Sequence, residues 1–215
     1  MEPFIRNAQY NVIKAQTKVL INGHSSASDP GVLKALKAVS LERVMTLIPE
    51  PTQEHRDLLE PVVSIKDKQD AELFLARLKP FVIPFRNGDI SEKALQKLFP
   101  KVKKLKLPNL EGMDFKEITY LGWTDIGQER KYIVTDRNGK LTGIRGTFRN
   151  HSQKGVCSIC NSIGDIGMFI TESKAAANGT FRNRGNYICQ DSQVCNQNLQ
   201  SEEKLHEFIE HLQNV

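Results

Sequence analysis

The chain has 215 residues, of which 39% are hydrophobic and 7% aromatic, so it can fold as one large or two small globular domains and is not disordered throughout. No run of 18 uncharged apolar residues occurs, and no basic stretch followed by an apolar one opens the chain, so we predict neither a membrane span nor a signal peptide and expect a cytoplasmic protein. The net charge is +5, and residues 91–200 hold 17 Lys and Arg against 10 Asp and Glu, which favours an anionic partner.

The first 85 residues are predicted to be helical. Apolar residues recur at helical spacing in four segments joined by short connections. The second segment carries helix-start signals, with Asp29 as a cap and Pro30 in the first turn. We therefore predict an N-terminal domain over residues 1–85 that is an antiparallel helical bundle. The four segments are residues 9–22, 26–48, 52–65 and 66–85.

A basic run follows the predicted bundle. Residues 91–100 predict a short helix that Pro100 ends, and four lysines come directly after it. We expect this run to cross the surface between the two halves of the chain. A solvated linker is the favoured interpretation, and a contact strip for an acidic partner is the alternative. The lysines are Lys101, Lys103, Lys104 and Lys106.

From about Phe115 the pattern changes to short strands. Five runs have strand character, and Asn138-Gly139 predicts a tight turn between the second and third. Residues 193–212 predict one or two closing helices. We therefore predict a mixed α/β domain over residues 86–215. The strand runs are residues 117–126, 130–136, 141–149, 166–172 and 185–189.

Four cysteines carry the strongest chemical signal. They are spaced Cys157-x2-Cys160 and Cys189-x5-Cys195, and two close pairs suit a tetrahedral metal ion, whereas four cysteines are too few to cross-link a secreted chain of this length. Cys189 ends a predicted strand, and we expect Cys195 in the first turn of the next helix, whose dipole favours a thiolate. A cysteine turn, a hairpin and a helix-borne ligand make up a treble-clef-like finger, so we predict one structural Zn²⁺ in the C-terminal domain.

Two other uses of the cysteines are less favoured. A redox C-x-x-C pair normally begins a helix after a parallel strand and needs no second pair. A catalytic zinc needs an open coordination position, which four thiolates do not leave. Because structural zinc sites contribute about 10–16 kcal/mol of apparent binding free energy, the C-terminal half is expected to need the metal to fold.

Several motifs together resemble one protein family. They are KYIVTDRNGKLTGIRG, KGVCSICN, GNYICQDSQVCN and LHEFIEHL, and the likeness extends over the helical half and LFPKVKKLKLP. They are similar to the FusB/FusC-type fusidic acid resistance proteins, which bind elongation factor G. The resemblance implies two domains, a helical bundle and an α/β domain with a four-cysteine zinc finger. It also implies that the C-terminal domain grips elongation factor G, and that the protein promotes release of the factor from ribosomes stalled by fusidic acid.

The resemblance places the contacts to elongation factor G at Val156, Arg184, Tyr187 and Phe208. In the family, the position of Val156 usually holds a larger aromatic residue, and the position of Arg184 usually holds a lysine. The positive charge is therefore kept at residue 184, whereas the large side chain is lost at residue 156. Physically, Tyr187 suits an interface anchor and the arginine an exposed loop. For Tyr187, packing in the core is the alternative to contact with the partner. For Phe208, packing in the core is the favoured interpretation.

Three classes of function remain open on the residues. The leading hypothesis is a non-catalytic, monomeric protein that binds elongation factor G and meets the ribosome only through it, with no membrane contact and no small-molecule substrate. The second is a zinc-stabilised RNA-binding protein that contacts the ribosome directly through the lysine run and the arginine loop. The third is an enzyme, but no set of nucleophile, base and oxyanion donors stands out in the sequence.

Overall fold

The computed structural model describes residues 1–88, 90–137, 139–174 and 181–213. The chain forms two compact units, Met1–Ile83 and Pro84–Val215, and each is described by itself. Within the described residues, no helix is both long enough and apolar enough to cross a bilayer.

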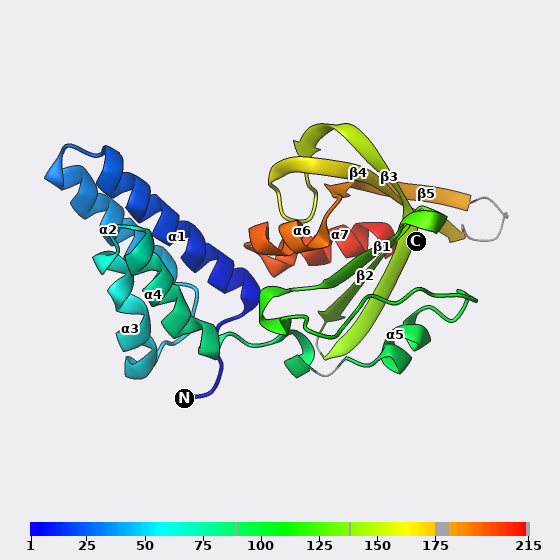
Figure 1. The fold of residues 1–215 in the computed structure, drawn as a ribbon, viewed down its shortest axis with the longest axis horizontal. Helices are drawn as coiled ribbons and strands as arrows, with labels where there is room; N and C mark the ends of the chain where they lie inside the picture. Colours follow the sequence, from blue (N-terminus) through cyan, green and yellow to red (C-terminus); the bar gives the residue numbers. More distant parts are fainter. Residues whose placement is uncertain (89, 138, 175–180, 214–215) are drawn as a thin grey trace. The chain divides into compact units, whose positions relative to one another are not determined.

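Unit 1, the residues up to Ile83, is a helical bundle, as predicted (Figure 1). Asp29 accepts a hydrogen bond from the backbone N–H of Gly31 at 2.7 Å, and Pro30 occupies the first turn behind it, so both helix-start signals act as expected. Asp67 caps the last helix in the same way, through the N–H of Asp70. The helices are α1 Asn7–Ser26, α2 Pro30–Met45, α3 Gln53–Leu59 and α4 Lys68–Leu78.

Prolines shorten two of the predicted helices. The segment expected over residues 52–65 ends as an α-helix at Leu59 and continues as the 3₁₀ helix Glu60–Ser64. Pro61 lies at the start of that 3₁₀ turn, and its missing N–H removes the hydrogen bond that would carry the α-helix on. The segment after α4 likewise becomes a 3₁₀ helix, Lys79–Phe81.

The two ends of unit 1 meet. Ile5 and Val82 form an isolated parallel bridge, and the N–H of Ile83 donates to the carbonyl of Ile5 at 2.8 Å. Both bridge residues are fully buried in the apolar core that the helices enclose. Unit 1 therefore has a closed core of its own, which contains Ile13, Leu20, Leu59, Phe74 and Leu78 among others.

Unit 2 is built on one antiparallel sheet with strand order β1-β2-β3-β4-β5. All five predicted strands are present, although β3, β4 and β5 are longer than expected and β1 is shorter. Asn138 lies outside the described residues, and its predicted turn partner Gly139 has a left-handed φ of 77°. The strands are β1 Leu121–Asp125, β2 Arg130–Arg137, β3 Lys140–Val156, β4 Ile163–Lys174 and β5 Phe181–Cys189.

Strand β3 serves two halves of the sheet. Residues 140–147 pair with β2, and residues 147–156 pair with β4, with a register shift between Asn150 and Lys154. A bulge of this kind bends the strand and strengthens its twist. Figure 1 shows β3 as a long, curved strand, and Cys157 directly follows its last residue, Val156.

Helices cover both faces of the sheet in unit 2. Along β2, Ile133 joins the cluster packed under α6 Ser192–Asn198 and α7 Glu202–Gln213. Its neighbours Tyr132 and Val134 point the other way, into the cluster under α5 Glu92–Leu98. This alternation means that β2 is buried on both faces.

The lysine run lies differently from what we expected. Lys101 to Lys106 fall inside unit 2 and do not link two units, because the division comes earlier, after Ile83. Val102, Leu105 and Leu107 in and after this run pack against the cluster under α5, while the lysines beside them are exposed. The segment is therefore an amphipathic cover of the sheet.

Candidate metal centre and contact surface

A turn, a strand end and a helix bring the four cysteines together. Cys157 and Cys160 lie in the turn between β3 and β4, Cys189 ends β5, and Cys195 is the fourth residue of α6. All four are buried, and their Sγ atoms lie within 4.8 Å of one another. Cys195 follows the capping residue Asp191, whose carbonyl accepts the Cys195 N–H at 3.1 Å, so this cysteine belongs to the first turn of the helix as predicted.

The cluster has the size that a tetrahedral zinc ion requires. Zn–S bonds of about 2.3 Å place neighbouring sulfurs of a regular tetrahedron about 3.8 Å apart. The Sγ atoms of Cys157 and Cys195 are 3.8 Å apart, and those of Cys160 and Cys189 are 3.6 Å apart. Four thiolates close the coordination sphere, so such an ion has a structural role.

The first cysteine pair forms a zinc-knuckle turn. Three backbone N–H groups point at the Sγ of Cys157, from Ile159 at 3.4 Å, Cys160 at 3.5 Å and Cys189 at 3.3 Å. Asn161 completes the turn with a left-handed φ of 56°, which asparagine tolerates better than most residues. A redox pair is expected at a helix start, whereas this pair connects two antiparallel strands.

A buried lysine that sequence analysis missed lies near the thiols. Lys131, on β2, is 1% exposed, and its Nζ donates to the carbonyl of Gln190 at 2.7 Å and lies 4.7 Å from the centre of the Phe148 ring. Burial lowers the pKa of Lys131 to about 8, and the thiolate of Cys195 opposes that shift. The ammonium group therefore offsets part of the negative charge that four thiolates bring into this core. The continuous apolar run after Lys131 could have signalled a strand covered on both faces.

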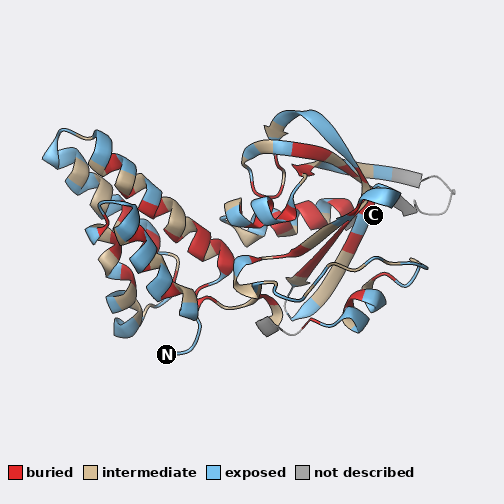
Figure 2. Cartoon of the chain, in the orientation of Figure 1, coloured by how far each residue is buried: buried red, intermediate tan, exposed pale blue. Residues whose placement is uncertain are grey.

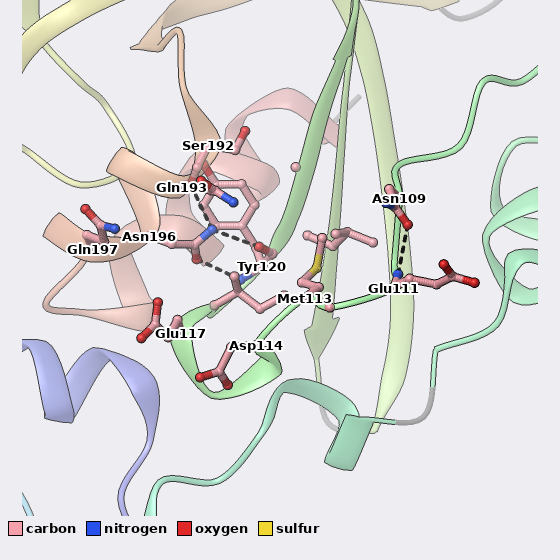
Figure 3. Close-up of a pocket in the computed structure, with 14 residues that line it drawn as sticks. Asn109, Glu111, Met113, Asp114, Glu117, Tyr120, Ser192, Gln193, Asn196 and Gln197 are labelled. Carbon is pink, nitrogen blue, oxygen red and sulfur yellow. Dashed lines mark hydrogen bonds between the residues drawn. The ribbon is translucent and has the colours of Figure 1, made fainter. Parts of the chain in front are cut away.

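Asn196 anchors the helix that carries Cys195. Its side chain is 2% exposed, accepts the N–H groups of Thr119 at 2.7 Å and Tyr120 at 3.2 Å, and donates to the Tyr120 carbonyl at 3.0 Å. Figure 3 shows the bonds between Asn196 and Tyr120 at the wall of a pocket of about 350 Å³ in unit 2. Because Tyr120 directly precedes β1, this one amide fixes α6 to the sheet and with it the fourth cysteine.

Two of the expected contact residues adjoin the knuckle. Val156 directly precedes Cys157 and is 53% exposed. Tyr187 is half-buried on β5, and its carbonyl accepts the N–H of Ser158 at 2.9 Å, which ties β5 to the turn. The ring of Tyr187 meets the edge of the exposed His151 ring with centroids 5.4 Å apart.

The other two expected contact residues lie on or against α7. The Nη1 of Arg184 donates to the carbonyl of His211 at 2.7 Å, in the last turn of the helix. Phe208 is 5% exposed and packs against Phe169 of β4, with ring centroids 6.1 Å apart. Core packing, the alternative favoured for Phe208 on the sequence, is therefore what the fold gives this side chain.

An exposed isoleucine completes the apolar surface around the knuckle. Ile163 begins β4 directly opposite Val156 and is 78% exposed. An exposed pair of large aliphatic side chains costs solubility, so it is typical of a surface that a partner covers. Sequence analysis missed Ile163, because a lone aliphatic residue after the cysteine turn gives no sign of which way it points.

Comparisons with known proteins agree with this architecture. The family described as "Elongation factor G-binding protein, N-terminal" matches residues 4–86, and "FBP C-terminal treble-clef zinc-finger" matches residues 98–213. No curated protein matches the chain. A solved structure, that of the fusidic acid resistance protein FusC, is 34% identical over 98% of both chains, with a TM-score of 0.86. The four clustered cysteines are thus one structural zinc site, and the chain belongs to the family of elongation factor G-binding proteins with a C-terminal treble-clef zinc finger.

Proposed function

We propose that this chain binds elongation factor G, promotes its release from ribosomes on which fusidic acid has stalled it, and so protects translation from the drug. The observation that carries the proposal is the likeness to FusC, a fusidic acid resistance protein, over 98% of both chains. The N-terminal match to an elongation factor G-binding protein supports the same partner. The protein acts as a monomer in the cytoplasm and as a binding protein without catalysis or a small-molecule substrate.

The contact surface surrounds the knuckle of unit 2. Val156 and Ile163 offer an exposed aliphatic pair, and Tyr187 adds a half-buried aromatic ring beside them in the fold. Aromatic side chains that a partner covers are common anchors of protein interfaces, and burying exposed aliphatic side chains beside them adds hydrophobic binding energy. Zinc and the knuckle hydrogen bonds hold these side chains in place before binding, which lowers the entropy lost on association.

Arg184 of β5 and Phe208 of α7 support that surface. A guanidinium has five N–H donors, and the bond to His211 uses one of them while it fixes the arginine at the helix end. Phe208 holds α7 against β4 through its contact with Phe169. Direct contact between Phe208 and elongation factor G would require its buried ring to leave the core. Both residues therefore position the contact surface.

Release of the factor requires a difference in affinity. A ligand shifts a conformational equilibrium only by as much as it binds one state more tightly than the other. The proposal is that unit 2 binds elongation factor G more tightly in a conformation that leaves the ribosome than in the drug-stalled one. The ribosome is then affected only through the factor.

Two measurements test the proposal with the full-length protein. The first mixes it with purified elongation factor G, without ribosomes, and looks for a complex by isothermal titration calorimetry. The second adds it to ribosomes stalled by fusidic acid and measures the factor's dissociation rate. We expect a complex in the first and faster dissociation in the second. Absence of a complex would contradict the proposal, and a complex without faster dissociation would remove the release step.

A further inference from the structure

Unit 2 presents a second surface that the proposed contact with elongation factor G does not use. Residues 93–110 contain six lysines and no acidic residue. The apolar side chains of this segment pack inward on the cluster under α5, and its lysines are exposed. In Figure 2 the ribbon of this segment is coloured mainly as exposed and intermediate. On α5, Lys93 and Lys97 are four residues apart and therefore share one face of the helix.

Most of these charges have no acidic partner in the fold. Lys106 lies 3.3 Å from a carboxylate oxygen of the buried Asp125. Within the described part of the chain, the other five lysines of the run form no ion pair. Their charge is thus left for a partner outside the chain.

An arginine from the sheet extends the same surface. Gly143 of β3 packs under the Phe99 ring, and Arg145 lies two residues further on, so it points to the same face of the sheet as α5. Arg145 and Lys101 both line a shallow recess of about 250 Å³ whose floor includes Leu98 and Pro100. Exposed positive charge from a helix, the segment after it and a strand therefore converges on one basic face.

We propose that this basic face binds the phosphate backbone of folded RNA. The face is defined by Lys93, Lys97, Lys101, Lys103, Lys104 and Arg145. Point charges on flexible stems suit phosphates, whose neutralisation supplies affinity without regard to sequence.

The composition of the face favours RNA over an acidic protein. Protein interfaces are anchored by large apolar or aromatic side chains that become buried. Among the described residues, the exposed large hydrophobic side chains lie elsewhere: Met1, Val32, Val39, Leu73, Ile126, Val156, Ile163 and Val194. The basic face therefore has charge and no apolar anchor, which is the profile of a backbone-binding surface.

The basic face is separate from the contact surface around the knuckle, which contains Val156, Ile163 and Tyr187. The basic face belongs to the side of the sheet that α5 covers, whereas α6 and the cysteines belong to the cluster on the other side (Figure 1). One molecule can therefore hold a protein through one surface and RNA through the other. The inference does not depend on whether elongation factor G is the protein partner.

The test uses the full-length, zinc-loaded protein and a fluorescein-labelled RNA hairpin, with affinity measured by fluorescence anisotropy between 50 and 200 mM KCl. The variant is Lys101→Gln/Lys103→Gln/Lys104→Gln. The matched control, Lys18→Gln/Lys34→Gln/Lys66→Gln, removes three exposed lysines of unit 1. We expect the variant to bind RNA at least about tenfold more weakly at 100 mM KCl, and its log K against log salt slope to be shallower by roughly 2. The control should keep both values within about twofold of the parent.

Three outcomes would overturn the inference. One is no RNA binding by the parent protein at 50 mM KCl. Another is an equal loss of RNA binding in the variant and the control, which would mean that net charge alone acts. The third is unchanged RNA binding with weakened binding to elongation factor G, which would make the basic face a protein-docking surface. Failure of the parent to bind elongation factor G would bear only on the proposed function.

Discussion

Lys131 shows how a single residue can serve a metal site that it does not ligate. Four thiolates around one divalent ion carry a formal charge of −2, and burying that charge is costly unless cations or N–H groups face it. The knuckle supplies N–H groups to Cys157. Lys131 supplies a positive charge, and its Nζ is held in place by the hydrogen bond that it donates to the carbonyl of Gln190, the residue after Cys189. Its ammonium also lies over the Phe148 ring, a favourable cation–π position.

Replacing Lys131 with methionine should weaken zinc binding. Lys131→Met keeps the length of the stem, removes the charge and takes a donor from the Gln190 carbonyl, at a cost of about 1–3 kcal/mol. We expect faster zinc release to a colorimetric chelator and a lower melting temperature. Lys154→Met, an exposed lysine near the first cysteine pair, is the control and should change neither. Equal release rates for the two variants would show that Lys131 has no electrostatic part in holding the metal.

Ile163 should matter for partner binding and little for folding. Ile163→Ser removes a side chain that is 78% exposed in the free protein, so its melting temperature should stay within about 2 °C of the parent. If elongation factor G covers the side chain, its loss removes about 1.5–3 kcal/mol of binding free energy, roughly a 10- to 100-fold weaker complex. Ile126→Ser, at an isoleucine that is 86% exposed, is the matched control. Titration calorimetry that finds the two variants equally tight would place the contact surface elsewhere.

At the scale of elements, the amide of Asn196 is a main attachment of α6 to the sheet. Asn196→Ala removes the acceptor of the Thr119 and Tyr120 N–H groups and the donor to the Tyr120 carbonyl, and each lost bond to a buried group costs about 1–3 kcal/mol. We expect unit 2 to lose about 2–5 kcal/mol of unfolding free energy in urea denaturation. Gln197→Ala, one residue further on the same helix and exposed, should lose less than about 0.5 kcal/mol. Matching urea midpoints for the two variants would refute the anchoring role.

Elements with local causes were predictable from the sequence, and those with tertiary causes were not. The cap at Asp29 and the cysteine turn follow from residues within a few positions of each other, so spacing alone finds them. The last residues of β3, from Asn150 on, are mostly polar and include Gly155, so the sequence alone did not predict a strand there. Pairing with β4 imposes the extended conformation. The depth of Lys131 likewise depends on helices far along the chain that cover both faces of β2.

At the scale of the whole molecule, the two units should respond differently to loss of zinc. Unit 1 buries Leu20, Leu59 and Leu78 in a core without a metal ligand. In unit 2 all four cysteines belong to the main buried cluster, and Lys131 is buried as well. Removing the ion therefore leaves four sulfur groups and an ammonium group buried without the metal that binds the sulfurs. A structural zinc site contributes about 10–16 kcal/mol, which exceeds the stability of most small domains.

We therefore expect a strong zinc chelator to unfold unit 2 and leave unit 1 folded in the full-length chain. Hydrogen–deuterium exchange should show protection lost along β4, β5 and α6 and kept along α1 and α4. Cys160→Ser should reproduce this pattern without chelator, while Ser158→Ala, in the same turn but not a thiol, should keep the parent's protection. Protection that survives in β4 and β5 after the zinc is removed would contradict the structural role of the metal. Loss of protection in α1 as well would show that unit 1 depends on unit 2 for its stability.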